Sequence, residues 1–155
     1  MTAIDRQIAQ QVADTLIAAE LTIPSFGEPY TADQITVDYL PRTDATQIAR
    51  SAKIFVCPRA RAINVVSRKQ QRRDHTIQVC VMQQATPNSE LFLDLIDLVH
   101  EIENTLAKAH QTPALRPIQR YATLLSTQCD LYDLNDLETK SIFRSVLTLN
   151  YLTNQ

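Results

Sequence analysis

The spacing of apolar residues predicts an amphipathic helix within residues 3–20. Apolar side chains recur there at every fourth position, which places them on one face of a helix. Pro24 and Pro29 follow, and the segment "PSFGEPY" is typical of a loop. The apolar stripe of the predicted helix consists of Ile4, Ile8, Val12 and Leu16.

A longer helix is predicted over residues 86–110. Ser89 or Asn88 can cap its N-terminus, and Glu90 in the first turn complements the helix dipole. About twenty helical residues extend ~30 Å, which is enough to cross a whole sheet. Two prolines in "TPALRPI" at 112–118 end the pattern. The inner stripe consists of Leu91, Leu95, Leu98, Ile102 and Leu106, widened by Phe92, Ile96 and Val99.

Alternation of apolar and polar residues predicts strands in most of the remaining chain. The clearest strand is 75–84, where Ile77, Val79 and Val81 face one way and the residues between them face a partly wet side. Pro58 marks an edge or a kink between two strand-like runs. The other predicted elements are strands at 34–41, 52–57, 62–67, 120–133 and 142–152, a linker at 43–51, and a turn or short helix at 134–140.

The stretch "SRKQQRRD" at 67–74 is the predicted tip of a long β-hairpin. Four of its eight residues are cationic, and its single acid comes last. The tip contains no glycine, because Gly27 is the only one in the chain, and tight two-residue hairpin turns favour glycine. We therefore expect a wider, mobile tip.

These elements predict an α+β fold in a single domain, residues 1–155. A chain of 155 residues is long enough for a sizeable core. Because the strands cluster and helices are few, we expect an antiparallel β-sheet with helices packed on one face and a long β-hairpin arm. The last strand should contribute Phe143, Leu147, Leu149 and Tyr151, which are in phase, to the core.

The distribution of charge is strongly uneven along the chain. Residues 45–73 contain eight Lys or Arg and no acid, while the other residues carry seven bases against seventeen acids, a balance of −10. The molecule should therefore be electrically two-sided. Such an arrangement favours oriented association over general binding of nucleic acid.

Several classes of site are excluded or disfavoured by composition. One glycine cannot form a glycine-rich phosphate loop. His75, His100 and His110 lack partners at zinc spacing, and Asp97 with His100 supplies only half of a helical di-iron pattern. We expect no metal and no cofactor. The cysteines, which should be buried thiols in a reducing compartment, are Cys57, Cys80 and Cys129.

An enzymatic function finds little support in the sequence. Glu138 and Lys140 have the acid-x-lysine form of restriction-like nucleases, and Asp130 or Asp133 could supply the upstream acid. This segment looks like a turn, however, and no nucleophile elbow is present. We see neither a signal peptide nor an apolar run of the ~18 residues that a membrane span needs. The sequence therefore predicts a protein that is not an enzyme and does not cross a membrane.

The basic tip has three possible roles: contact with phosphates, contact with a protein partner, or simple hydration. No aromatic residue lies between 60 and 77 to stack on bases, so sequence-specific recognition of nucleic acid is poorly supported. The charge asymmetry favours contact between the tip of one copy and an acidic face of the next. The candidate interface residues are Arg59, Arg61, Arg68, Lys69, Arg72 and Arg73 on the basic side, and Asp94, Asp97 and Glu101 on the acidic side.

The order of elements resembles the tail-terminator (tail-completion) proteins of long-tailed bacteriophages. The resemblance spans residues 1–153. It rests on the hairpin "FVCPRARAINVVSRKQQRRDHTIQVCVMQQ", the acidic helix "ELFLDLIDLVHEIENTL", and the final "LYDLNDLETKSIFRSVLTLNYL". The most specific strings are "LYD" at 131–133 and "FRSVLTLNY" at 143–151, with "PRAR" at 58–61. Connector and stopper proteins of the same head–tail junction are an alternative.

This resemblance implies a structural protein of the virion, made in the host cytoplasm. A sixfold ring of subunits would cap the tail tube, end its polymerisation and present its other face to the head connector. The implied partners are other copies of the chain, the tail tube protein and the connector or stopper. DNA would pass through the lumen, where contact should be weak and independent of sequence. The resemblance implies no catalytic residue.

Overall fold

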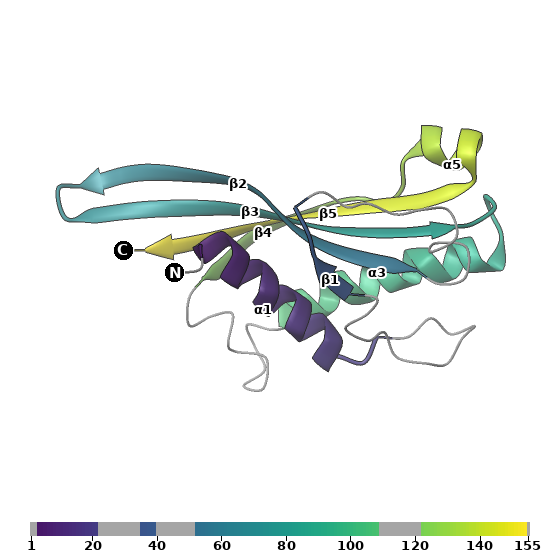
Figure 1. Cartoon of the computed structure of the whole chain (residues 1–155), viewed down its shortest axis with the longest axis horizontal. Coiled ribbons are helices and arrows are strands. Elements are labelled where there is room, and N and C mark those ends of the chain that lie inside the picture. The colour runs from purple at the N-terminus through teal and green to yellow at the C-terminus, as the bar shows by residue number, and fades with distance from the viewer. Residues whose placement is uncertain (1–2, 22–34, 40–51, 109–121, 155) are drawn as a thin grey trace.

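A single sheet organises the computed structural model, which describes residues 3–21, 35–39, 52–108 and 122–154 (Figure 1). In this part of the chain five strands lie in the order β1-β2-β3-β5-β4, together with three helices. The α+β fold is therefore confirmed. The strands are β1 Ile35–Val37, β2 Lys53–Ser67, β3 Gln70–Gln84, β4 Thr123–Asp130 and β5 Ile142–Asn154, and the helices are α1 Ile4–Ala18, α3 Glu90–Lys108 and α5 Leu134–Lys140.

One strand departs from the antiparallel sheet that the sequence predicts. β1 pairs in parallel with β2, so the sheet is mixed, whereas the pairs β2–β3, β3–β5 and β4–β5 are antiparallel. A parallel neighbour needs a long connection, and residues 38–52 between these strands supply it. β1 is also shorter than the predicted strand at 34–41. The loop at 24–30, the linker at 43–51 and the prolines at 112–118 lie outside the described residues.

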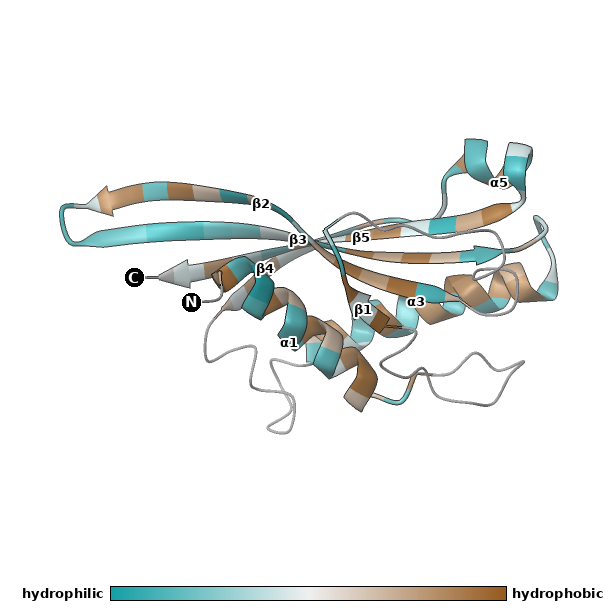
Figure 2. Ribbon diagram, viewed as in Figure 1, coloured by the Kyte–Doolittle hydropathy of each residue, from teal (hydrophilic) through white to brown (hydrophobic). Residues whose placement is uncertain are grey.

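Helices α1 and α3 both pack against the same face of the sheet, as predicted. Each helix presents an apolar stripe to a common core, whose strand residues come from β1, β2, β3 and β5 (Figure 2). The alternation in the strands explains this face, because every second side chain points toward the helices. The buried helical residues include Ile8, Val12, Leu16, Phe92, Leu95, Leu98, Val99, Ile102 and Leu106, and the strand residues include Ile77, Val79, Val81, Phe143, Leu147, Leu149 and Tyr151.

Polar side chains cap the two helices that follow turns. The hydroxyl oxygen of Ser89 accepts a hydrogen bond from the Phe92 amide at 3.2 Å, so Ser89 is the cap of α3. The carboxylate of Asp133 accepts from the Asp136 amide at 3.0 Å and starts α5. Segment 134–140 is therefore a short helix rather than a turn. Ser141 ends α5 in the left-handed conformation, with φ of 51°.

The tip of the β2–β3 hairpin is tighter than the sequence predicts. Ser67 pairs with Gln70, so only Arg68 and Lys69 form the turn, and the expectation of a wider tip is wrong. Neither residue adopts positive φ, which the common two-residue turns require. A shift of register between Val65 and Ser67 accompanies the turn, and such a bulge can absorb the mismatch in twist.

The face of the sheet that points away from the helices carries a second, smaller cluster. Phe55, Cys57 and Cys80 are buried there, beside the half-buried Met82 and Val146. All three cysteines are free thiols. The prediction of buried thiols is confirmed for Cys57 and Cys80, whereas Cys129 is only half-buried. Among the described residues, none of the helices is long and apolar enough to cross a membrane.

Candidate assembly surfaces

The most prominent surface feature is a hairpin arm, defined as residues 59–74. Figure 1 shows it extending past the helices and past the end of β5. Every residue from 59 to 72 is exposed. β1 pairs only with residues 54–56 of β2, so beyond Pro58 no described strand occupies the outer edge of the arm. The shift of register at Pro58 lies where this free edge begins, and it confirms the edge or kink expected there.

The structure divides the six predicted cations of the arm into anchored and free groups. The Nε of Arg59 donates to the side-chain oxygen of Gln78 at 2.9 Å. The Nη1 of Arg61 lies 3.4 Å from a carboxylate oxygen of Asp5. Both side chains therefore attach the base of the arm to the body. Arg72 pairs with Asp74 at 3.1 Å within the arm itself.

Arg68 and Lys69 are the cations best placed to meet a partner. They form the turn itself, both are exposed, and neither side chain makes an ion pair with another described residue. Arg73 differs because it is half-buried and its Nε has no hydrogen-bond partner among the described residues. The tip thus concentrates two unneutralised charges at the far end of the arm.

The arm also carries exposed apolar side chains. Ile63 is 51 % exposed, Val65 71 % and Val66 66 %. Ile63 and Val65 pair with Arg73 and Gln71, which places them on the helix side of the sheet but beyond the helices that would cover them. Ile63 and Val65 lie two positions apart on this face, so they form a small contiguous apolar patch, and such patches are typical of surfaces that meet another molecule.

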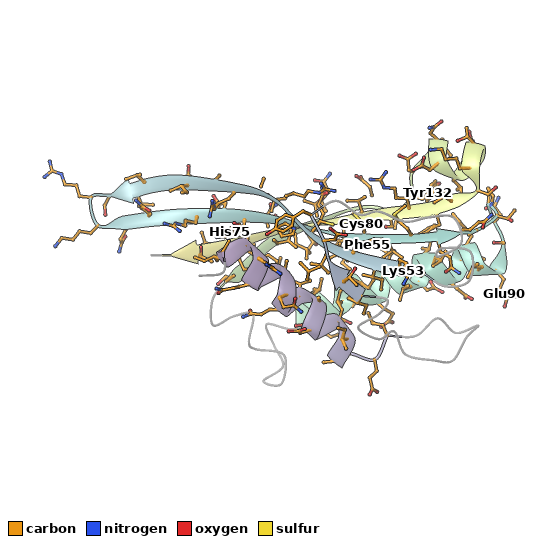
Figure 3. The ribbon with its side chains drawn as sticks, viewed as in Figure 1. Lys53, Phe55, His75, Cys80, Glu90 and Tyr132 are labelled. Carbon is orange, nitrogen blue, oxygen red and sulfur yellow. The ribbon has the colours of Figure 1, made fainter. Side chains whose placement is uncertain are left out.

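A buried polar network fixes the base of the arm to the body. His75 is fully buried, and its Nδ1 lies 2.5 Å from a carboxylate oxygen of Asp5 in α1. Its Nε2 lies 2.8 Å from the hydroxyl of Thr153 in β5. Asp5 also meets Arg61 of β2, so four elements converge on this point (Figure 3). The order carboxylate, imidazole, hydroxyl is that of a nucleophilic triad, but Thr153 is only 6 % exposed, and neither cleft described below reaches it.

The predicted acidic surface lies on α3, where its residues differ in exposure. Asp97 and Glu101 are exposed and lie one turn apart, whereas Asp94 is half-buried and engaged by another residue. Asp97 and Glu101 line a cleft of about 440 Å³ together with Glu20 and His100. Its leucines, Leu21 and Leu98, are themselves buried.

A larger cleft of about 780 Å³ opens where β4 and β5 meet α5. Leu131 is 48 % exposed, Tyr132 41 % and Leu134 58 %, and all three line it. The Tyr132 ring stacks edge-on against Phe92 of α3, with centroids 5.6 Å apart, which anchors this rim to the core. The other lining residues are Cys129, Asp130, Asp133, Asn135, Arg144 and Val146.

The acids proposed for a nuclease are only partly brought together. Asp130 and Asp133 line the larger cleft, but Glu138 and Lys140, in the last turn of α5, do not. Lys140 lies 3.7 Å from Asp136, its neighbour one turn earlier. No group of three or more metal-ligating side chains occurs within the described ranges. The geometry therefore lends no support to a metal-dependent nuclease. His110, considered above as a metal ligand, lies outside the described residues.

Two cysteines interact directly on the face away from the helices. A hydrogen bond between the thiols lowers the pKa of Cys80 to about 7 and raises that of Cys57, and burial raises the pKa of Cys57 further. The positive charges of Arg144 and Arg59 also favour the Cys80 thiolate. Burial raises the pKa of Cys129. Phe55 and Met82 pack around Cys57 and Cys80, which limits the access of reagents to these two thiols.

Besides the larger cleft, sequence reasoning missed two features of these surfaces. His75 was considered only as a metal ligand, although its phase with Ile77 and Val79 indicates a buried polar residue that needs partners. Nothing in the sequence indicates that Glu20 and Asp97 line the same cleft, because this depends on how α1 and α3 pack together. No protein-family model matches the chain, and no curated protein matches it.

Proposed function

We propose that this chain is a tail-terminator protein, which assembles as a ring on the end of a bacteriophage tail tube. The observation that carries the proposal is the arm, which combines free cations with exposed apolar residues and extends beyond the body of the subunit. Docking of such a surface on another protein is favourable, because it removes exposed apolar area from water. The resemblance in sequence supplies the identity of the assembly.

The uneven charge supports an ordered, head-to-tail arrangement of subunits. The arm carries Arg68 and Lys69 at its tip, and α3 carries Asp97 and Glu101 on its exposed side. In a ring, opposite charges on different faces orient the arm of one copy toward the body of the next. Asp94 contributes to the same acidic side.

A capping assay on purified tail tubes tests the proposed function. Tubes mixed with the protein should stop growing and should carry a ring at one end in negative-stain images. Tubes that lengthen in its presence as they do alone, or virions that lack the protein, would contradict the proposal. Binding to head connectors but not to tubes would support the alternative of a connector or stopper protein.

The double variant Arg68→Glu, Lys69→Glu tests the arm within this function. Reversing both free charges should weaken ring formation or tube attachment at least about tenfold, since each close charge pair contributes on the order of 1 kcal/mol or more. Negative-stain counts of capped tubes provide the measurement, and circular dichroism verifies the fold.

The control variant is Arg59→Glu, which reverses a cation that is tied to Gln78 at the base of the arm. It should reduce capping less than the tip variant. Normal capping by the tip variant would show that the arm tip is only a hydrated turn.

A further inference from the structure

The arm and the larger cleft lie at opposite ends of the molecule. The arm contains the start of β3, while the cleft lies beside the start of β5, which pairs with the end of β3. β3 contains 15 residues and so extends roughly 45–50 Å. The arm of one molecule therefore cannot reach its own cleft, and any contact between them must join two copies.

The two surfaces match in chemistry. The arm presents Ile63, Val65 and Val66, and the rim of the cleft presents Leu131 and Leu134 with Tyr132. A volume of about 780 Å³ lies within the range of ligand-binding clefts, so it has room for a few side chains of the arm. Each set is left in water in the free subunit, so docking one on the other removes both from solvent.

The charges of the two surfaces also match. Among its lining residues the cleft carries two acids, Asp130 and Asp133, against one cation, Arg144. Arg144 lies 3.9 Å from Asp136, which further reduces its positive field. The cleft is therefore acidic overall, whereas the arm is strongly basic. The cleft on α3 is more acidic still, but its leucines are buried, whereas Leu131 and Leu134 of the larger cleft are exposed.

We propose that the cleft between β4, β5 and α5 is the seat for the hairpin arm of a second copy of this chain. The contact uses two different surfaces on each subunit, so it is directional, and it builds the proposed ring where the rotation between neighbours closes. The acidic side of α3 then orients the arm at a distance but does not hold it. This inference rests on the proposed function, because it names the contact between subunits from which that ring is built.

Directed disulfide formation tests the contact. We would make Val66→Cys and Leu134→Cys as separate proteins, each also carrying Cys129→Ser, which removes the half-buried native thiol. The equimolar mixture should form a disulfide-linked heterodimer under mild oxidation, in which two thiols lose two protons and pass two electrons to the added copper–phenanthroline and oxygen. The matched control pairs Val66→Cys with Leu125→Cys, since Leu125 is 48 % exposed but lies outside the cleft.

The expected result is a yield from the Val66 and Leu134 pair at least about tenfold above that of the control pair, because docking raises the effective thiol concentration. Equal yields from the two pairs would overturn the proposal, as would failure of the cleft pair under conditions where wild type sediments as an oligomer. A single protein carrying both substitutions should give a ladder of linked species rather than dimers alone.

A second variant separates this inference from the proposed function. Leu134→Glu adds a carboxylate in the first turn of α5, where the helix dipole tolerates it, so the fold should persist. It should weaken self-association roughly tenfold or more, whereas Leu125→Glu should leave it unchanged. Tube capping at the wild-type level by Leu134→Glu would refute the seat but keep the function. Self-association through the cleft by a protein that never caps tubes would refute the function but keep the seat.

Discussion

His75 joins three elements at one buried point, because its imidazole on β3 contacts Asp5 of α1 and Thr153 of β5. Both ring nitrogens have partners, so the burial of this polar side chain is compensated. Arg61 extends the network to β2 through the same carboxylate. At the scale of single residues, this group lies where the covered body ends and the arm begins.

Replacing His75 by Ala should lower the free energy of unfolding by roughly 2–3 kcal/mol. The substitution removes a buried ring, leaves the Thr153 hydroxyl without the imidazole, and leaves Asp5 with Arg61 alone. Urea unfolding monitored by circular dichroism provides the measurement. His100 is exposed and pairs with Asn104 on the same helix, so His100→Ala is the control, with an expected change within about 0.5 kcal/mol. Equal effects of the two substitutions would mean that the buried network contributes no stability.

Periodicity predicted which residues form the core more reliably than it predicted individual contacts. The stripes of α1 and α3 and the in-phase residues of β5 were identified because a regular element repeats the same environment every turn or every second residue. The partner of His75 lies 70 positions away in the sequence, so no local pattern could reveal it. For the same reason, no local pattern could show that Glu20 and Asp97 line one cleft.

The helix α3 and the hairpin show different limits at the scale of elements. The start of α3 was predictable because a serine cap and an acidic first turn act locally. The hairpin tip was predicted too wide because two-residue turns favour glycine. In the structure Arg68 and Lys69 form the turn without glycine, beside a bulge in the pairing of Val65 and Ser67. The parallel pairing of β1 also escaped prediction, since alternation does not reveal the direction of a neighbour.

Removing the cap of α3 should destabilise the protein moderately. Ser89→Ala loses the hydrogen bond to the Phe92 amide and should cost about 1 kcal/mol in the free energy of unfolding. Thermal or urea unfolding checks this value. The control is Glu101→Ala, at an exposed position in the middle of the same helix, which should change stability by less than about 0.5 kcal/mol. A neutral Ser89→Ala would mean that water replaces the hydroxyl at no cost.

At the scale of the whole molecule, charge and apolar surface are distributed along one long axis. The arm lies at one end of β3, and Tyr132, which lines the larger cleft, lies toward the other end (Figure 3). The sequence predicted that the basic stretch lies in a hairpin, and the structure places it in the arm. It did not predict the cleft, because its walls come from the end of β4, the helix α5 and the start of β5, and only the fold brings them together.

Self-association should weaken, but persist, as salt concentration rises. Between about 50 mM and about 500 mM salt, screening should reduce the attraction between the basic arm and the acidic body several-fold. The apolar part of the contact does not depend on screening and should hold a residual affinity. Sedimentation velocity at both concentrations measures this. Association that vanishes completely at high salt would indicate a purely electrostatic contact, and unchanged association would indicate that charge has no role.

β3 passes without interruption from the core into the arm, paired on one side with β2 and on the other with β5. The direction in which the arm leaves the subunit is consequently inherited from the twist of a packed sheet and not from a flexible joint. In an assembly held by the arm, the geometry of the interior would fix the angle from one subunit to the next. Substitutions beneath α1 and α3, far from any neighbour, could then change how many subunits close the circle.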